Sequence, residues 1–549
     1  MNFSTLLKTV AFLAVTLFFF SPFQSNAQLI KNAAVHGNFQ LDAQYYIEDS
    51  SINAPDVPEK MLMNGFANII FTSDNFEAGV RYESYENALL GFDPRYEGSG
   101  IPFRYATYTS DELTVTVGNF YEQFGNGLIF RSYEERTLGV DNAVDGVRIK
   151  YIPIRGLNLK TFIGKQRSFF DKGPGIVRGA DATLNITDVF NKSESPKSNL
   201  SVGIGVVSKY QDDQDPIYNL PENVLAFSPR LNYSIGNISL SAEYAHKYND
   251  PSTINELIYK NGDALLLSAT YTKKGIGFVV SAKRMDNMDF RSDRTAQGNN
   301  LNINYLPALT KIKTYRLSTL YPYATQPNGE MGLQSEFFYK IKRGTPLGGK
   351  YGTKVSFNFT SIHNIDTTWN VPNDTMGYES DFFALGDEKY YQDFSVEVEK
   401  KFSMKSKLIT EVLYFVYDKD VIQGLSGFGK IHSNIVTLDF EYKFNNKHSL
   451  RTELQHLYTE QDMQSWAFVL AEWSISPNWF ISAFDEYNYG NDIEDDRIHY
   501  LNTAVAYVKK ANRISLGYGK QREGLLCVGG ICRNVPASNG FTLSVSSSF

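Results

Sequence analysis

The sequence predicts an all-β fold, a single large antiparallel β-barrel that crosses a membrane with about 26 strands, within a range of about 22–26. The last ten residues alternate apolar and polar side chains and end on Phe549. Similar alternating segments recur along the chain from Val35 onward. After the N-terminus, no apolar run reaches the ~18 residues that a spanning helix needs. A membrane-spanning chain without such helices must be a closed barrel, because lipid leaves unpaired backbone groups unsatisfied.

The N-terminal residues 1–27 read as a secretory signal peptide. Lys8 is the only charge, an apolar run covers 10–20, and the small residues Ser25 and Ala27 precede Gln28. This is the pattern of a cleaved export signal rather than of a membrane anchor. The predicted domains are therefore the signal peptide, 1–27, and the barrel, 28–549. Gln28 stands where a lipoprotein would have Cys, so we expect no lipid anchor.

The expected strands place apolar side chains on one face and polar ones on the other. In the first strand Val35, Phe39, Leu41 and Tyr45 alternate with polar residues such as Gln40. Comparable alternation covers 76–83, 238–244, 436–444, 504–508 and 514–518. Polar-in, apolar-out segments of roughly ten residues are typical of outer-membrane barrels.

Short turns and longer polar segments are expected to alternate along the chain. The turn chemistry recurs at 73–75, 110–112, 154–156, 236–237, 273–275, 404–406 and 476–478. The longer segments are 48–61, 86–101, 121–145, 210–222, 249–261, 287–298, 363–389 and 523–539. We expect short turns in the periplasm and long loops outside the cell. Within 287–332 we expect two further short strands, at 301–305 and 315–320.

The terminal strand resembles the closing strand of a bacterial outer-membrane barrel. Phe541, Leu543, Val545 and Phe549 fall on one face. The resemblance implies that the barrel-assembly machinery reads this strand during biogenesis. The alternative is the edge strand of a soluble β-sandwich. Together with the export signal, the strand predicts a multi-pass protein of the outer membrane.

Composition and tryptophan positions agree with that location. Aromatic residues make up 14% of the chain, with 35 Tyr and 39 Phe, which suits aromatic girdles at the membrane interfaces. Trp473 and Trp479 bracket an expected periplasmic turn, and Trp466 lies near the other end of its strand. We expect all three to be interfacial anchors. The net charge of −7 and the lack of a basic stripe argue against nucleic acid as a partner.

The segment 118–146 carries the main candidate site. It is rich in glycine and aromatic residues and holds Arg131, Glu134, Glu135 and Arg136 within six positions. Because charges facing lipid cost several kcal/mol, these side chains should face the lumen or water. One interpretation is an inward-folded loop that constricts a pore and sets its selectivity. The other is an ion-paired brace that stiffens the wall or shuts the lumen, and the sequence leaves both open.

Cys527 and Cys532 are expected to form a disulfide. They enclose Val528-Gly529-Gly530-Ile531, and the glycines permit a tight reversal. Exported thiols this close should oxidise. The loop before the final descending strand must be external, so the disulfide should shape a surface loop. A two-Cys metal site is a poor alternative because no His lies nearby.

Two blocks of the chain resemble a known family. The block GNFYEQFGNGLIFRSYEERTLGVDNAVDG and the Cys-x4-Cys-Arg segment before the terminal Phe match a family of large outer-membrane barrels from Bacteroidota whose function is unknown. The resemblance implies the fold and the location. It implies neither a substrate nor catalytic residues.

An enzymatic function is not expected. The seven histidines, at 36, 246, 363, 432, 448, 456 and 499, are scattered, and no nucleophile-elbow, metalloprotease or P-loop motif occurs. No cofactor and no metal are expected. The acidic run 492–496 is read as a solvated loop, with a divalent-cation site at an external loop as the alternative.

Two functions remain from the sequence. One is a porin-like channel or transport barrel. The other is a non-transporting barrel subunit of a secretion, assembly or surface-attachment complex. The expected partners are outer-membrane lipid and lipopolysaccharide, the barrel-assembly machinery and, in the second case, other proteins of such a complex.

Overall fold

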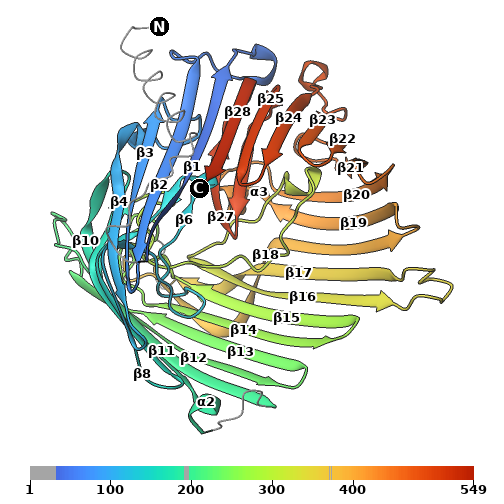
Figure 1. The fold of residues 1–549 in the computed structure, drawn as a ribbon. Coiled ribbons are helices and arrows are strands. Elements are labelled where there is room, and N and C mark those ends of the chain that lie inside the picture. Colours follow the sequence, from blue (N-terminus) through green and yellow to red (C-terminus); the bar gives the residue numbers. More distant parts are fainter. Residues whose placement is uncertain (1–31, 191–196, 370, 372–373) are drawn as a thin grey trace, which may run out of the picture.

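A computed structural model describes residues 32–369, 371 and 374–549, apart from 191–196. The predicted signal peptide lies outside the described residues. The chain forms one closed antiparallel barrel of 24 strands, in which each strand pairs with its neighbours and β28 returns to β1 (Figure 1). The first and last described strands thus meet in the wall.

The barrel strands alternate up and down in chain order. They are β1 (Ala33–Tyr46), β2 (Met61–Ser73), β3 (Phe76–Glu86), β4 (Gly98–Thr109), β5 (Leu113–Phe120), β8 (Val144–Ile154), β9 (Leu157–Ser168), β10 (Asp171–Asn185), β11 (Ser198–Tyr210), β12 (Asn223–Ile235), β13 (Ile238–Lys247), β14 (Gly262–Lys273), β15 (Ile276–Asp286), β16 (Gly329–Ile341), β17 (Thr353–Trp369), β18 (Tyr378–Lys401), β19 (Ser406–Asp418), β20 (Lys430–Lys443), β21 (His448–Tyr458), β22 (Trp466–Ile475), β23 (Trp479–Tyr487), β24 (Asn502–Lys509), β25 (Asn512–Gln521) and β28 (Ser538–Ser548).

Four short strands lie outside the wall. β6 (Glu134–Glu135) pairs with β7 (Val140–Asp141), and β26 (Gly524–Val528) pairs with β27 (Ile531–Val535). Helices are few and short, with α2 (Ile186–Phe190) and α3 (Lys419–Gln423) in connections. Within the described ranges, no helix is long and apolar enough to cross a bilayer.

The alternation of the first and last strands explains how the barrel closes. Leu41 lies opposite Val545, Ala43 opposite Leu543, and Tyr45 opposite Phe541, so apolar side chains share the outer face. The backbone of Phe549 exchanges two hydrogen bonds of 3.1 Å with Gly37. The apolar residues of the terminal strand therefore lie on the outer face where the barrel closes, as predicted.

The outer surface of the wall is apolar. Large apolar side chains are exposed there on strand after strand: Val80, Val117, Ile163, Ile204, Leu231, Leu240, Leu267, Leu333, Phe357, Val412, Val436, Leu454, Val469, Val505 and Leu516. An apolar band this extensive far exceeds the patches that water-soluble monomers expose. The inner face is polar, as Gln40, Asp42 and Gln44 illustrate on β1.

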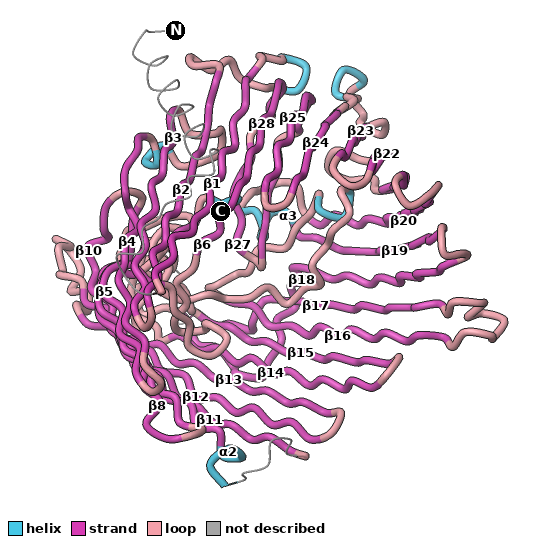
Figure 2. The backbone as a smooth tube through the Cα atoms, viewed as in Figure 1, coloured by secondary structure: helices cyan, strands magenta, loops and turns pink. Residues whose placement is uncertain are grey.

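Most of the tight turns lie at one end of the barrel and most of the long connections at the other (Figure 2). The exceptions include the two-residue turn 169–170, at the end with the long connections, and the connection 342–352, at the end with the tight turns. The turns at 74–75, 155–156, 236–237 and 274–275 share an end with the C-terminus, which we call the turn end. The opposite end, with connections such as 47–60 and 287–328, is the loop end. One expected loop, 363–389, is much shorter, because β17 continues to Trp369 and β18 begins at Tyr378.

The strand count is close to the prediction but lower. The strands expected at 301–305 and 315–320 do not form. Residues 301–305 hold only an isolated bridge, between Asn302 and Arg291, and 317–319 is a single 3-10 turn. Their apolar side chains, Leu301, Ile303 and Leu317, are buried inside the barrel rather than directed to lipid. These two segments are apolar, as their sequence shows, but their apolar side chains pack inside the lumen and do not form strands of the wall.

One of the three predicted interfacial anchors, Trp466, does not lie at an interface. Trp473 and Trp479 are exposed on the outer face at the turn end, as expected. Trp466 is 1% exposed and packs inside the barrel near Tyr500, with ring centroids 6.1 Å apart. It stands seven positions before Trp473, and an odd number of positions places two strand residues on opposite faces.

Candidate functional site

Three segments from the loop end fold into the lumen: 121–143, 287–328 and the β26–β27 hairpin, 524–535. We call them together the plug. The Arg131 backbone donates to the Ile303 carbonyl at 2.9 Å, joining the first two segments. The Tyr305 hydroxyl donates to the Gly529 carbonyl at 2.8 Å, joining the second segment to the hairpin. The three segments therefore form one connected body inside the ring of strands.

Two apolar clusters hold the plug against opposite parts of the wall. In the first, Phe124, Leu128, Phe130 and Ile303 pack on strands β8 to β15. In the second, Leu317, Tyr321 and Tyr323 pack on strands β17 to β22. Because burial of each such side chain contributes about 1.5–3 kcal/mol, the plug is anchored on both sides of the lumen.

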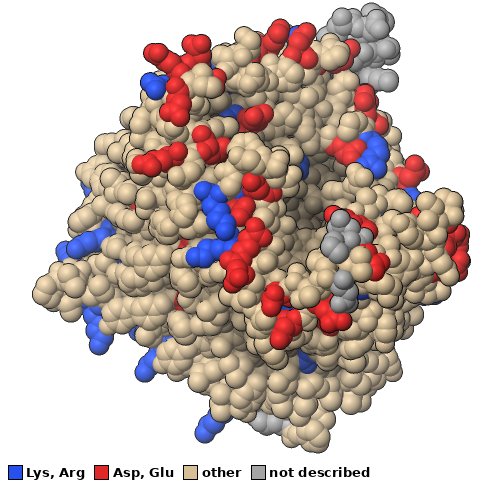
Figure 3. All heavy atoms as spheres, turned by 180° about the vertical axis from the view of Figure 1, so that it is seen from behind, with Lys and Arg blue, Asp and Glu red and all other residues tan. Residues whose placement is uncertain are grey.

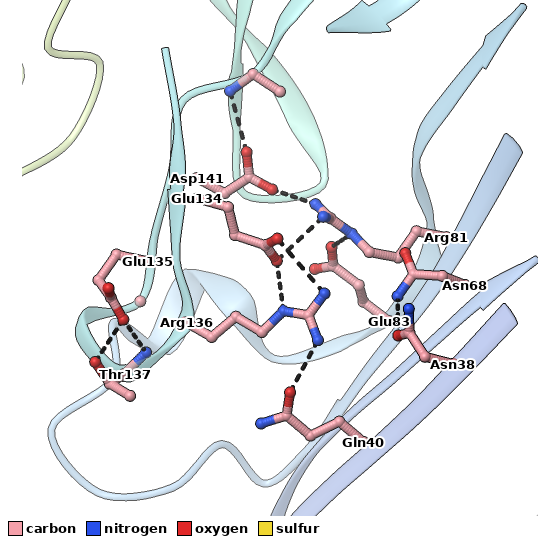
Figure 4. A network of polar contacts seen from close by, with 12 residues as sticks. Asn38, Gln40, Asn68, Arg81, Glu83, Glu134, Glu135, Arg136, Thr137 and Asp141 are labelled. Atoms are coloured by element: carbon pink, nitrogen blue, oxygen red, sulfur yellow. Dashed lines mark hydrogen bonds and ion pairs between the residues drawn. The ribbon is translucent and has the colours of Figure 1, made fainter. Parts of the chain in front are cut away.

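Of the four predicted site residues, Glu134 and Arg136 join the plug to the wall through polar contacts (Figure 4). Arg136 Nε lies 2.6 Å from Glu134 Oε1, and Arg136 Nη1 donates to Gln40 Oε1 on β1 at 2.9 Å. Glu134 also pairs with Arg81 Nη1 on β3, at 3.1 Å. Sequence reasoning placed these charges in the lumen, where they lie.

A more deeply buried set continues this network. Arg81 pairs with Glu83 at 2.7 Å and with Asp141. Arg167, on β9, binds Glu83 at 2.5 Å and Asp141 at 2.6 Å. The side chains of Arg167 and Glu83 are only 2% and 1% exposed. Arg167 and its pairing with Glu83 and Asp141 were not predicted from the sequence, although Arg81 and Glu83 stand two positions apart on one predicted inner face.

The network is balanced in charge. Three guanidinium groups, of Arg81, Arg136 and Arg167, meet three carboxylates, of Glu83, Glu134 and Asp141. Buried charges are tolerated where each has a partner, and removing one partner leaves an uncompensated charge. This arrangement is that of a brace between the plug and the strands β1, β3 and β9.

Arg131 and Glu135 take other roles. The Arg131 guanidinium lies between two aromatic rings, 4.6 Å from the centroid of Tyr133 and 4.0 Å from that of Tyr305. Such cation–π contacts need no carboxylate. Glu135 accepts hydrogen bonds from the Thr137 backbone, at 3.2 Å, and from its hydroxyl, at 2.6 Å, and so caps a 3-10 turn. The structure thus does not bring the four residues together at one constriction.

Glu122 makes a separate cluster at the underside of the plug. Its carboxylate binds Lys150 on β8 at 2.7 Å and Lys160 on β9 at 2.8 Å. Burial alone would raise the pKa of Glu122, but the two ammonium groups hold this pKa below its ordinary value. The carboxylate is therefore an ionised anchor of the first plug segment.

The middle of the 287–328 segment is held to the opposite wall by basic side chains. Lys313 pairs with Asp393 on β18 at 2.5 Å, and Arg316 pairs with Glu486 on β23 at 2.7 Å. Arg522, before the hairpin, also reaches Glu486, at 2.8 Å. The segment therefore crosses the lumen and is ion-paired to the wall on its far side.

Cys527 and Cys532 form the predicted disulfide, as facing residues of the β26–β27 hairpin. The hairpin leans into the lumen rather than outward. The Asn299 amide donates to the Cys532 carbonyl at 2.6 Å. The disulfide thus stands where the hairpin meets the 287–328 segment.

No group of three or more His, Cys, Asp or Glu side chains in the described part of the chain is arranged to hold a metal ion. The acidic residues Glu494 to Asp496 form an exposed 3-10 turn at the loop end. Asp and Glu side chains dominate this end, which Figure 3 shows from behind, and gather around a hollow in it.

A family defined by sequence covers almost the whole chain. The description of this family is "Family of unknown function (DUF6029)", and its match spans residues 6–549. The chain is a member of DUF6029. No curated protein matches the sequence of this DUF6029 protein.

Solved structures that are similar to this DUF6029 protein share little sequence identity with it. A double mutant of the ferric enterobactin receptor PfeA from Pseudomonas aeruginosa is 11% identical, with 94% of this chain and 80% of that chain covered and a TM-score of 0.41. OpdQ from the same organism is 10% identical over 95% and 98%, with a TM-score of 0.33. The translocation pore of the P pilus usher, PapC, is 9% identical over 94% and 99%, with a TM-score of 0.42.

Proposed function

We propose that this protein is an outer-membrane transport barrel whose own plug closes the loop end of the lumen. The location is supported by the apolar outer face, because a surface of this kind is stable only in lipid. Exposed Trp473 and Trp479 at the turn end suit an interfacial girdle. The loop end would then face outward and the turn end the periplasm, as in other barrels of this type.

The observation that carries the proposal is the contrast between the two halves of the lumen. Toward the turn end the inward side chains of Ser544, Ser546 and Ser548 are exposed to solvent. At the loop end the plug buries the inner face of the wall. A ring of 24 strands is wide enough to leave an open aqueous hole unless something fills it. Transport therefore requires the plug to move.

Some of the contacts that hold the plug to the wall are weak enough to allow such movement. The ion pairs at Glu134 and Arg136 are noncovalent and about one-fifth exposed, and the plug is covalently linked to the wall only through the chain itself. A local rearrangement of 121–143 would open a passage along β1 to β3 without unfolding the barrel.

The second candidate is a non-transporting barrel subunit of an outer-membrane complex. The specific observation in its favour is the anchoring of 287–328 on both sides of the lumen, through Lys313, Arg316 and the apolar clusters. A plug held so firmly would make the barrel a stable platform.

Single-channel recording in planar bilayers tests the proposal. We expect wild-type protein to show transient openings and the Glu134→Gln, Arg136→Gln double variant to open more often, because the brace to β1 and β3 is weakened. A control with residues 305–325 replaced by a short Gly-Ser linker should conduct steadily. If this control conducts while the wild type and the double variant stay closed, the non-transporting candidate is favoured.

A further inference from the structure

Two adjoining cavities open at the loop end, beside the ion-paired brace, whose Asp141 lines the smaller one. The larger has a volume of about 670 Å³ and the smaller one of about 320 Å³. They share four lining residues, Phe169, Gln297, Asn300 and Leu301. Sites for small ligands usually enclose about 300–1,000 Å³, so the pair has room for a ligand of several linked rings.

The lining suits a ligand rich in hydroxyl groups. Amide side chains, which offer both donors and an acceptor, come from Gln297 of the plug and Asn534 of the disulfide hairpin. Neither amide has a hydrogen-bond partner within the described part of the chain. The aromatic ring of Tyr96 adds an apolar surface to the smaller cavity. Sugars combine these properties, since their hydroxyl groups need hydrogen bonds and their C–H faces pack on aromatic rings.

Arg533, immediately after Cys532, is the one charged residue lining the smaller cavity that has no ion pair among the described residues. The two carboxylates in the same lining, of Asp93 and Asp141, are already paired with arginines other than Arg533. Its Nε donates to the Thr137 carbonyl at 2.8 Å, and its guanidinium lies 4.3 Å from the centroid of the Phe92 ring. Unlike Arg81 and Arg167, it pairs with no carboxylate among the described residues. Burial lowers the pKa of Arg533 because it disfavours the cation. An anionic group bound here would compensate that charge.

The guanidinium is held in place by close packing. Gly91 has a φ of +82°, and a Cβ at this position would lie 2.6 Å from Arg533 Nη1. Only glycine leaves room for the side chain there. On the other side, the disulfide sets the hairpin that carries Arg533. The residue is thus fixed before any ligand binds.

Phe169, at the border of the two cavities, has an unfavourable backbone conformation. Its φ is +58°, in the left-handed region that bulky residues avoid. The ring contacts Tyr96 edge-on, at 4.7 Å between centroids, and the Arg95 guanidinium lies 4.4 Å from its centroid. Backbone conformations of this kind concentrate at functional sites.

We propose that the two cavities bind an acidic oligosaccharide, with its carboxylate on Arg533 and its sugar rings along Phe169 and the amides of Gln297 and Asn534. The ligand could be a free oligosaccharide or the acidic sugars of a lipid headgroup. This binding does not depend on whether the lumen conducts, since the site lies at the outer mouth.

Calorimetric titration of the full, detergent-purified barrel tests the proposal. The probes are pentagalacturonate, sialyllactose and, in nanodiscs, rough lipopolysaccharide, with cellopentaose as the neutral comparison. We expect at least one acidic probe to bind more tightly than cellopentaose. Arg533→Gln should weaken that binding by about tenfold or more, and Arg533→Lys should weaken it less.

The matched control is Arg497→Gln, which removes an exposed arginine at the same end that lines neither cavity, and should leave binding unchanged. Heat-modifiable migration on gels verifies that each variant is folded. Binding of the soluble probes indicates a free oligosaccharide, and binding of lipopolysaccharide alone indicates the headgroup. The proposal is overturned if no acidic probe binds, or if binding is unchanged in folded Arg533→Gln.

Discussion

At the scale of single residues, the lumen is organised by pairing of opposite charges. Arg167 lies on β9, Glu83 on β3 and Asp141 in the plug, and their contacts at 2.5 and 2.6 Å join three parts of the chain. Nearly complete burial makes each partner necessary for the others. The predicted site residues Glu134 and Arg136 extend this network toward the solvent-filled part of the lumen.

Replacing Arg167 with Gln should destabilise the barrel strongly. Glu83 and Asp141 would lose a buried partner, at a cost of about 3–5 kcal/mol. The measurement is the temperature at which the folded gel band converts to the unfolded one, which should fall. Arg104→Gln is the control, because Arg104 is 55% exposed and makes one contact of 3.5 Å, with Asp145. Equal stability of the two variants would contradict the brace.

The Glu122 carboxylate predicts a response to acid. Its pKa in the folded protein lies below the ordinary value of 4.5. Its contribution to stability is therefore complete above pH 4.5 and is lost as the pH falls through the lower, folded value. We expect channel openings to become more frequent as the pH falls below 4.5, once it reaches the lowered pKa of Glu122. Glu122→Gln should show frequent openings already at neutral pH, and an unchanged pH profile in that variant would refute the assignment.

At the scale of elements, strand facing decides what each side chain does. Trp466 and Trp473 share β22 but lie on opposite faces, one inside the barrel and one toward lipid. The same alternation places Phe541, Leu543 and Val545 outside and Ser544 inside on β28. A tryptophan near the end of a strand is therefore an interfacial anchor only if its side chain is on the outer face.

The two tryptophans of β22 should differ in their effect on stability. Trp466→Ala leaves a cavity against Tyr500 and should cost about 3–5 kcal/mol. Trp473→Ala removes a side chain that is 45% exposed and should cost less. Urea unfolding in lipid vesicles, followed by fluorescence, measures both. A larger loss for Trp473→Ala would show that Trp466 is not part of the core.

The disulfide hairpin should affect the plug more than the wall. Closing a loop this short contributes at most ~2–3 kcal/mol, and no barrel strand depends on it. We expect Cys527→Ser, Cys532→Ser to fold as a heat-modifiable barrel with easier proteolysis of 524–535. Maleimide tagging of unreduced, denatured wild type should label no thiols. Two tagged thiols would contradict the disulfide.

At the scale of the whole molecule, closure depends on the seam between the first and last strands. The Phe549 backbone pairs with Gly37, and a Cβ on Gly37 would lie 2.9 Å from the Phe549 ring, so the ring packs closely over this glycine. Beyond this seam, the ring of strands has no free edge. The plug then decides whether the enclosed space is a passage.

Deleting Phe549 should slow or abolish assembly in the outer membrane. The last pair of backbone bonds and the ring over Gly37 would be lost, together with the terminal aromatic residue that resembles an assembly signal. Cell fractionation with the heat-modifiability assay measures this, and Ser548→Ala serves as the control. Recovery of wild-type protein as a soluble periplasmic monomer would contradict the outer-membrane location.

The sequence by itself determined the wall of this protein. Facing along a strand is a local property with a period of two residues, so alternation such as that in 35–47 and 541–549 predicted apolar-out strands. The export signal and the lack of a long apolar run then predicted that these strands close into a barrel. The inward direction of Trp466 was also local, since its odd distance from Trp473 separated their faces, although its burial depends on the plug residues in the same apolar cluster. The hairpin disulfide followed from the spacing of two cysteines and two glycines.

Only the tertiary structure decided what fills the barrel. Residues 301–305 and 315–320 are apolar enough for strands, and nothing in their own pattern shows that they pack inside the lumen. Arg167 meets Glu83 and Asp141 only because ring closure and an inward-folding loop bring distant parts of the chain together. Such contacts depend on the positions of all strands at once, and a local pattern carries no information about them.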